Sequence, residues 1–237
     1  MNELIETHQH RPWGLPSERW KFYQEWNRAI FLHWEVDLKE LQKLVPVGLD
    51  IDVYKGKAWV SLVAFTMEKI RPRNLPQIPP ISNFHEINIR TYIKSGEKTG
   101  VYFLSIEGAK KLSCALAKGI SELPYRFSKM TRNEGFFKSQ NKPFGDRFSI
   151  EFNVGVHKEK NDFENWLTER YALFQDSPKG INAFEIHHLE WPIQELSIAK
   201  LNVQYDRFSH LIGGKPDCVH YSEGVKVLAF GKKKMNP

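Results

Sequence analysis

Cysteine is scarce in this sequence, and its scarcity excludes a disulfide-stabilised secreted scaffold. Only Cys114 and Cys218 occur among the 237 residues, and neither belongs to a CxxC pair. Neither a disulfide framework nor a zinc site built on paired cysteines is therefore indicated. We expect two free thiols in a reducing cytoplasm, with no bound metal and no cofactor.

Long hydrophobic runs are also missing. No stretch approaches the roughly 18 consecutive apolar residues that cross a bilayer. The segment from Met1 to His10 is polar and lacks the apolar core of a signal peptide. These two absences predict a cytoplasmic protein without a membrane partner.

A one-sided distribution of charge is missing as well, although the net charge is +6. Half of that excess comes from Lys232, Lys233 and Lys234 near the C-terminus. The other basic residues are interleaved with acids, as in Glu18-Arg19. Without a basic stripe or a nucleic-acid motif, no nucleic-acid partner is expected.

The fingerprints of several common catalytic sites are absent. There is no GxGxxG, P-loop or GxSxG motif, which argues against a nucleotide site and a standard hydrolase serine. His85-Glu86 does not continue as HExxH. His187 and His188 are neighbours on an expected strand, so their side chains point to opposite faces. One structural and one pocket-lining histidine are therefore favoured over a metal pair.

Hydrophobic residues with a period of two dominate the sequence, which is typical of β-strands. The clearest case is residues 85–94, where an apolar face alternates with a polar one. The polar face comprises Glu86, Asn88, Arg90 and Tyr92. Residues 58–67 are nearly all apolar, as in a strand covered on both faces. Further strands are expected over residues 31–37, 101–106, 148–154, 184–189, 196–203 and 219–230.

Few helices are expected, and they lie over residues 20–27, 38–44, 109–120 and 162–174. Asp162 is the expected N-cap of the last one, and the proline-dense residues 71–80 are expected to form an extended loop. This content predicts an α+β domain, mainly β, built on a large closed antiparallel sheet. No linker interrupts the chain, so we expect one domain over residues 1–237, with tails at residues 1–18 and 231–237.

Sequence motifs of one family occur in order along nearly the whole chain. Residues 84–93 match the strand pattern F-x-E-x-N-x-R-T-Y-V of that family. Other matching blocks are residues 45–52, 56–60, 100–106, 123–125, 167–171, 187–192 and 220–222. On these residues the chain resembles the YqjF-like branch of the acetoacetate decarboxylase-like superfamily. The resemblance implies a cone-shaped, closed antiparallel β-barrel that encloses a small ligand cavity, with helices outside.

The chain departs from the decarboxylase at the central step of its chemistry. That enzyme uses a lysine to form a Schiff base, and a second cation beside it lowers the pKa of the nucleophile. Its lysine pair follows a proline, whereas here Pro124 is followed by Tyr125 and Arg126. Arginine stays protonated and is not such a nucleophile. Lys129 lies close by in sequence, but nothing in the sequence turns it inward, so Schiff-base decarboxylation is not expected.

Glu86 occupies the position of the decarboxylase pocket carboxylate, and the resemblance implies that its face of the strand points into the barrel. A buried Glu86 should then be matched by Arg90, Arg126 or another cation. The candidate ligand-binding residues are Glu86, Asn88, Arg90, Tyr92, Tyr125, Arg126 and His188. Each has an ordinary structural role as the alternative, and Arg170 is expected in a helix-surface ion pair more than in an anion clamp.

Three functions remain open. The favoured one is binding of a small organic acid or aromatic ligand in the cavity. An enzyme that uses Glu86 for acid–base catalysis is the second, and it predicts a carboxylate with a raised pKa in a closed pocket. A scaffold with a filled interior is the third. The expected partner is a small molecule, and self-association into a homo-oligomer stays open.

Overall fold

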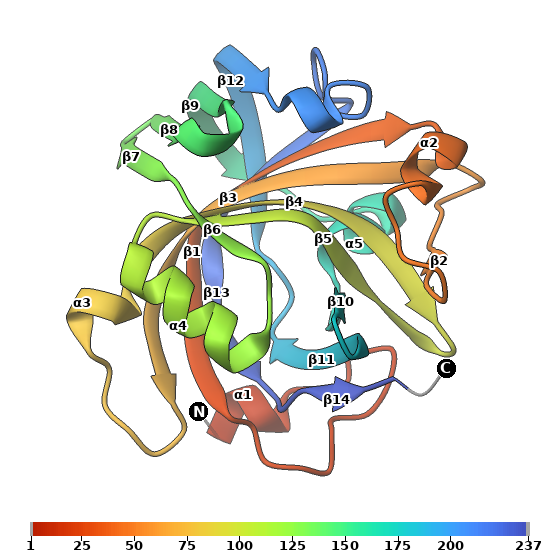
Figure 1. The fold of residues 1–237 in the computed structure, drawn as a ribbon, viewed down its shortest axis with the longest axis vertical. Coiled ribbons are helices and arrows are strands. Elements are labelled where there is room, and N and C mark those ends of the chain that lie inside the picture. Colours follow the sequence, from red (N-terminus) through yellow and green to blue (C-terminus); the bar gives the residue numbers. More distant parts are fainter. Residues whose placement is uncertain (1, 236–237) are drawn as a thin grey trace.

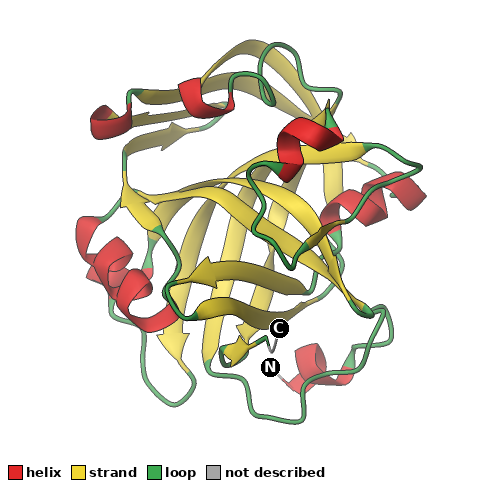
Figure 2. Ribbon diagram, turned by 45° about the vertical axis from the view of Figure 1, so that its right-hand side comes forward, coloured by secondary structure: helices red, strands yellow, loops and turns green. Residues whose placement is uncertain are grey.

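The structure is a computed structural model that describes residues 2–235. It consists mostly of long strands with short helices at the periphery (Figures 1 and 2). The strands are β1 (Phe22–Val36), β2 (Asp50–Ile51), β3 (Ala58–Pro72), β4 (Phe84–Ser95), β5 (Lys98–Gly108), β6 (Tyr125–Phe127), β7 (Lys129–Asn133), β8 (Phe136–Asn141), β9 (Asp146–His157), β10 (Ala172–Ser177), β11 (Gly180–His188), β12 (Ile193–Gln204), β13 (Cys218–Ala229) and β14 (Lys233–Lys234). The α-helices are α1 (Asn2–Glu6), α2 (Leu38–Gln42), α3 (Pro79–Ser82), α4 (Lys111–Ser121) and α5 (Asp162–Thr168).

Seven of these strands pair in a ring. The order runs β11-β10-β5-β4-β3-β1-β13, and β11 pairs again with β13. Most of the pairs are antiparallel, but β10 runs parallel to β5, so the expectation of a wholly antiparallel sheet is wrong here. A parallel neighbour requires a crossover instead of a hairpin, and the long connection between β5 and β10, which contains α4 and α5, provides it.

The sheet continues from β13 through β12, β9, β8 and β7, and these strands arch over β3 and β4 at the top of Figure 1. The main apolar core lies between this layer and the ring. Ile87 and Ile89 of β4 pack there with Phe137 and Phe148. Because alternate residues of a strand point to opposite faces, the other face of β4 is directed to the interior of the ring.

Two of the expected helices are corrected by the structure. Residues 22–27 belong to β1, which pairs with β3 on one side and β13 on the other. Burial follows a period of two in this segment, since Tyr23 and Glu25 are buried between less buried neighbours. The second correction concerns α5, which ends at Thr168, so that β10 begins at Ala172.

The N-cap of α5 is Asn161 and not Asp162. The Asn161 side chain accepts the backbone N–H of Glu164, whose carboxylate accepts the backbone N–H of Asn161 in return. Such a reciprocal capping box satisfies two backbone donors at once. The proline-dense segment also differs from the expected loop, because β3 extends to Pro72 and α3 begins at Pro79.

The segments expected to be tails lie against the sheet. Leu4 is buried, and its carbonyl oxygen is 2.5 Å from Nε2 of His187. Arg11 is paired with Glu185 of β11, at 3.5 Å. At the other end, β14 pairs with β11. No helix within residues 2–235 is both long enough and apolar enough to cross a bilayer.

Candidate functional site

A cavity of about 230 Å³ lies inside the ring of strands. All seven strands of the ring contribute side chains to its wall. Most of the wall is aromatic or aliphatic and includes Trp26, Phe31, Val63, Phe65, Met67, Phe103 and Trp191. A few polar groups interrupt it, and these are Gln24, Glu86, Asn88, Arg90, Ser121, Tyr125, Thr168, Arg170 and His188, with Lys21 and Lys232 at the margin. A mostly apolar cavity with a few converging polar groups is typical of a small-molecule site.

The strand β4 supplies three of these polar groups. Glu86, Asn88 and Arg90 alternate with Ile87 and Ile89, which pack in the outer core. The three polar side chains are buried, with Glu86 only 2 % exposed. The polar face of β4 therefore faces the cavity because its apolar face is covered by β7, β8 and β9.

Glu86 is held by two hydrogen bonds and no cation. The hydroxyl of Tyr125 donates to Oε2 at 2.7 Å, and Nδ2 of Asn88 donates to Oε1 at 3.3 Å. Burial raises the pKa of Glu86 to about 7, although both hydrogen bonds oppose the rise. The expected pairing with Arg90 or Arg126 is wrong, because a carboxyl group that holds a proton near neutral pH needs no buried cation.

Arg90 is a charged group of the cavity wall that has no acidic partner among the described residues. It forms no ion pair within residues 2–235, and its Nε and Nη2 are buried without a hydrogen-bond acceptor. Burial lowers the pKa of Arg90, and so does the nearby guanidinium of Arg170, whereas the hydroxyl of Tyr92 opposes the shift. Arginine nevertheless stays charged in proteins, so the cavity contains a buried cation without a counter-charge.

Arg170 also lines the cavity, although it was expected on a helix surface. It follows α5, and its side chain is only 4 % exposed. Its Nη1 lies 2.5 Å from Oδ2 of Asp52, and its Nε donates to the carbonyl oxygen of Trp166 at 2.7 Å. Nη2 of Arg170 is left without a partner. The interior of the ring thus holds two guanidinium groups with unused donors.

Of the other residues predicted to bind a ligand, two line the cavity and two lie outside its wall. Tyr125 and His188 line it, and Nδ1 of His188 lies 2.7 Å from the carbonyl oxygen of Leu189. Burial lowers the pKa of His188, which keeps the ring neutral. Arg126 and Tyr92 lie outside the lining. Tyr92 is buried further along β4, where its hydroxyl is 2.5 Å from Oγ of Ser61.

No buried lysine lines the cavity in the part of the chain that the structure describes. Lys21 and Lys232 reach its margin, and both are exposed. Lys129 begins β7 and is exposed outside the lining. A lysine in the position needed for a Schiff base inside the cavity is therefore absent from residues 2–235.

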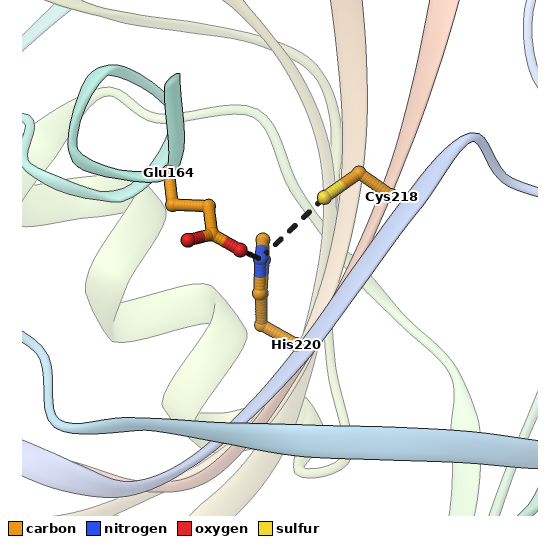
Figure 3. A group of neighbouring side chains, drawn as sticks. All are labelled: Glu164, Cys218 and His220. Atoms are coloured by element: carbon orange, nitrogen blue, oxygen red, sulfur yellow. Dashed lines mark hydrogen bonds and ion pairs between the residues drawn. The ribbon is translucent and has the colours of Figure 1, made fainter. Parts of the chain in front are cut away.

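A second polar cluster lies apart from the cavity and was not predicted. Glu164, Cys218 and His220 converge between α5 and β13 (Figure 3), and none of them lines the cavity. A partial signal was present in the sequence, because Cys218 directly precedes the strand expected over residues 219–230, and its spacing of two from His220 would put both on one face of an extended strand. Glu164 could not be added from spacing, since its position depends on how α5 packs.

Comparison with known proteins gives a consistent result. The family DUF2071, described as an uncharacterized conserved protein, matches residues 23–226. The uncharacterized protein YqjF of Bacillus subtilis (strain 168) is 29% identical over 248 residues, which cover 98% of this chain and 99% of YqjF.

Solved structures of low sequence identity share the fold. The acetoacetate decarboxylase of Legionella pneumophila superposes with a TM-score of 0.63 at 14% identity, covering 98% of this chain and 94% of the enzyme. The enduracididine biosynthesis enzyme MppR superposes with a TM-score of 0.60 at 12% identity, covering 92% of this chain and 91% of MppR. The chain is thus a member of the DUF2071 family, with a mainly β fold like that of acetoacetate decarboxylase.

Proposed function

We propose that this protein binds a small organic acid in the cavity, with Arg90 as the anchor for the carboxylate. The observation that carries the proposal is the buried guanidinium of Arg90, which has no acidic partner among the described residues and whose Nε and Nη2 have no acceptor. An uncompensated buried charge is strongly destabilising. A carboxylate ligand offers the missing counter-charge and can accept two parallel N–H donors from one guanidinium.

The rest of the cavity suits the remainder of such a ligand. Nη2 of Arg170 supplies another free donor, and the hydroxyl of a protonated Glu86 can donate to a second oxygen of the ligand. The wall is otherwise aromatic and aliphatic. The volume of about 230 Å³ lies below the roughly 300–1,000 Å³ of drug-sized pockets, so we infer a ligand of few heavy atoms.

One analogy supports this assignment. MppR, which has the same fold, has been solved in complex with pyruvate, a small 2-oxo acid. We further infer that the ring of strands acts as the closed barrel that the sequence resemblance implies. A scaffold with a filled interior is disfavoured, because the interior contains a cavity lined by charged groups.

An enzyme that uses Glu86 for acid–base chemistry is the second candidate. A carboxyl group with a pKa of about 7 can both give and take a proton near neutral pH. Pyruvate in deuterated buffer offers a test of proton abstraction beside a carbonyl. Exchange of its methyl hydrogens that is catalysed by the wild type and lost in Glu86→Gln would support catalysis.

Calorimetric titration with pyruvate, benzoate and benzamide tests the binding proposal. Benzoate and benzamide have similar shapes, but only benzoate carries a charge. Hydrogen bonds to a charged group contribute about 1.5–3 kcal/mol, so benzoate should bind at least about tenfold more tightly than benzamide. Arg90→Met should remove this preference.

Arg147→Met is the matched control, because Arg147 is exposed on β9 outside the cavity. It should bind the probes as the wild type does. Equal affinity for benzoate and benzamide, or unchanged benzoate binding by Arg90→Met, would refute Arg90 as the anchor.

A further inference from the structure

Three different metal-binding side chains meet between α5 and β13 (Figure 3). Cys218 and His220 project from the same face of β13, and Glu164 is the third residue of α5. Oε1 of Glu164 lies 3.0 Å from Nε2 of His220, and Sγ of Cys218 lies 3.4 Å from the same nitrogen. All three ligand atoms lie within 4.8 Å of one another.

These separations resemble those around a tetrahedral zinc ion. Bonds of about 2.3 Å to sulfur and 2.0–2.2 Å to nitrogen or oxygen place tetrahedral ligand atoms roughly 3.3–3.6 Å apart. The two measured separations need to change by only a few tenths of an ångström to reach these values. Thiolate, imidazole and carboxylate are also the ligand types that zinc binds in proteins.

The arrangement does not fit a nucleophilic triad. In a triad, one ring nitrogen of histidine faces the nucleophile and the other faces the acid. Here both Cys218 and Glu164 face Nε2 of His220, while Nδ1 faces Nε2 of His33 at 3.3 Å. Both side chains therefore lie on the same side of the His220 ring, where one cation could contact all three ligand atoms.

The second ring nitrogen of His220 contacts a buried residue, His33, as the second nitrogen of a metal-binding histidine usually contacts a buried polar partner. Nδ1 of His33 lies 2.6 Å from Oγ of Ser61 and 3.2 Å from the hydroxyl of Tyr92. The outer partners of a metal-binding histidine fix its tautomer and its orientation. His33 and its two hydroxyl partners can reverse their donor and acceptor roles, so this network can follow a change of tautomer at His220.

The ammonium group of Lys158 would compete with a metal ion for the carboxylate of Glu164. Its Nζ lies 2.5 Å from Oε1 of Glu164, and its side chain is 38% exposed. Glu164 is thus already paired with a cation, but the Lys158 side chain is flexible and can move into solvent. Because Cys218 is half-buried, solvent can also reach the position opposite the three side chains.

We propose that Glu164, Cys218 and His220 bind Zn²⁺ in an open site, with water as the fourth ligand and Lys158 displaced. Three protein ligands and one water are typical of an accessible zinc site. On binding, the Cys218 thiol gives its proton to solvent and the thiolate bonds the metal. The ring proton of His220 moves from Nε2 to Nδ1, which then donates a hydrogen bond to Nε2 of His33, and the ring proton of His33 moves from Nε2 to Nδ1, which faces Ser61 and Tyr92.

Titration of the full-length, metal-free protein with Zn²⁺ and with Co²⁺ tests the site. One equivalent of each should bind, and Co²⁺ should give a thiolate-to-metal charge-transfer band in the near ultraviolet. Cys218→Ser should lose this band and bind Zn²⁺ at least about tenfold more weakly. Cys114→Ser is the matched control, since Cys114 is the other cysteine and is buried on α4, and it should keep both properties.

Two further variants separate the direct ligands from their surroundings. Lys158→Met should bind Zn²⁺ more tightly than the wild type because it removes the competing ammonium. His33→Phe should weaken binding about 10–100-fold while the charge-transfer band persists at saturation, since the ligands remain. Thermal unfolding of the metal-free variants shows whether each is folded.

Three results would overturn the proposal. They are a wild type that binds no Zn²⁺, a Cys218→Ser variant that keeps the charge-transfer band, and a Cys114→Ser variant that loses it. Nitrogen-15 NMR gives an independent readout, because Zn²⁺ should change the protonated ring nitrogen of both His220 and His33. Unchanged tautomers on addition of Zn²⁺ would equally contradict the site.

Discussion

Two arginines on either side of β5, the buried Arg90 and the partly buried Arg126, have opposite surroundings. Arg126 of β6 lies 3.0 Å from Glu107 and 3.3 Å from Asp146. Arg90 of β4 has no acidic partner within residues 2–235, and two of its nitrogens have no acceptor. Both guanidinium groups are desolvated, which lowers the pKa of each. Arg126 therefore has its acidic partners within the protein, whereas Arg90 has none among the described residues, and this is the reason for which we propose an anionic ligand.

This difference follows from strand register. β6 pairs in parallel with β5, and Arg126 lies directly opposite Glu107 in that pairing. Arg90 lies opposite Phe103 on β5 and Ser61 on β3, and neither side chain carries a charge. The comparison teaches that burial alone does not identify a binding arginine. The arginine without an internal counter-charge is the one to test for ligand binding.

The largest effect on the free energy of unfolding is expected from replacing Arg126, the arginine that has acidic partners. Arg126→Met leaves the buried carboxylate of Glu107 without its cation, whereas Asp146 keeps Arg207 at 3.5 Å. Loss of one partner of a buried ion pair costs about 3–5 kcal/mol, so urea denaturation should show a decrease of this size in the free energy of unfolding. A decrease below about 1 kcal/mol would contradict a structural role for Arg126.

The same variant tests whether the chain forms one cooperative unit. The Arg126 cluster and the cavity share β5, so we expect the wild type and Arg126→Met each to unfold in a single calorimetric transition. Two separable transitions, or two stable halves after limited proteolysis, would show that the two regions fold independently.

A somewhat smaller effect on stability is expected from the titration of Glu86 as the pH changes. Its pKa is about 7 in the folded protein against 4.5 as the ordinary value. Between these values the folded state holds a proton that the unfolded state has lost, so stability falls as pH rises from about 5 to 7. A rise of this size corresponds to a loss of about 3 kcal/mol.

Glu86→Gln should remove that loss, because glutamine does not titrate. Unfolding free energies at pH 5 and pH 8 measure it directly. Glu35→Gln is the control, since Glu35 is exposed and paired with Lys57 at the surface, and it should keep the dependence of the wild type. A slope in Glu86→Gln equal to that of the wild type would exclude Glu86 as its source.

A still smaller effect, of opposite sign, is expected from Arg90. Replacing a buried charged group with an apolar one of similar size can stabilise a protein by about 1–4 kcal/mol. Arg90→Met should therefore raise the free energy of unfolding of the ligand-free protein, by about 1–2 kcal/mol. If Arg90→Met were instead as damaging as Arg126→Met, Arg90 would have a structural partner and the contrast between them would fail.

The sequence predicts part of the difference between Arg90 and Arg126, but not all of it. Alternation along β4 correctly places Glu86, Asn88 and Arg90 on one face, but it does not say which face points inward. In a sheet with one side in water, the polar face would be outside. Here both faces are buried, because β7, β8 and β9 cover the apolar one, and only the family resemblance indicated this arrangement.

Tyr125 and Arg126 belong to β6, a short strand that was not expected from the sequence. They are adjacent on a strand, so only one of them can face the cavity. The structure places Tyr125 inside and Arg126 outside. The acidic partners of Arg126 could not be foreseen, since Asp146 reaches it only because β8 and β9 fold back over the ring. Arg170 was missed for a similar reason, because its place depends on the parallel pairing of β10 with β5.

The smallest expected effect is a null result in a Schiff-base assay. Incubation with acetoacetate and borohydride, followed by mass spectrometry, should leave the mass of the protein unchanged. A Schiff base needs an unprotonated amine beside the keto acid, and burial beside a second cation is what lowers a lysine pKa enough. The cavity offers only Tyr125 at the expected position, and the lysines at its margin, Lys21 and Lys232, are exposed to water. An adduct on either of these lysines would show that one of them can enter the cavity and lie beside Arg90. In that case, the unpartnered guanidinium would serve as the second cation, and the cavity would contain the decarboxylase pair in a different arrangement.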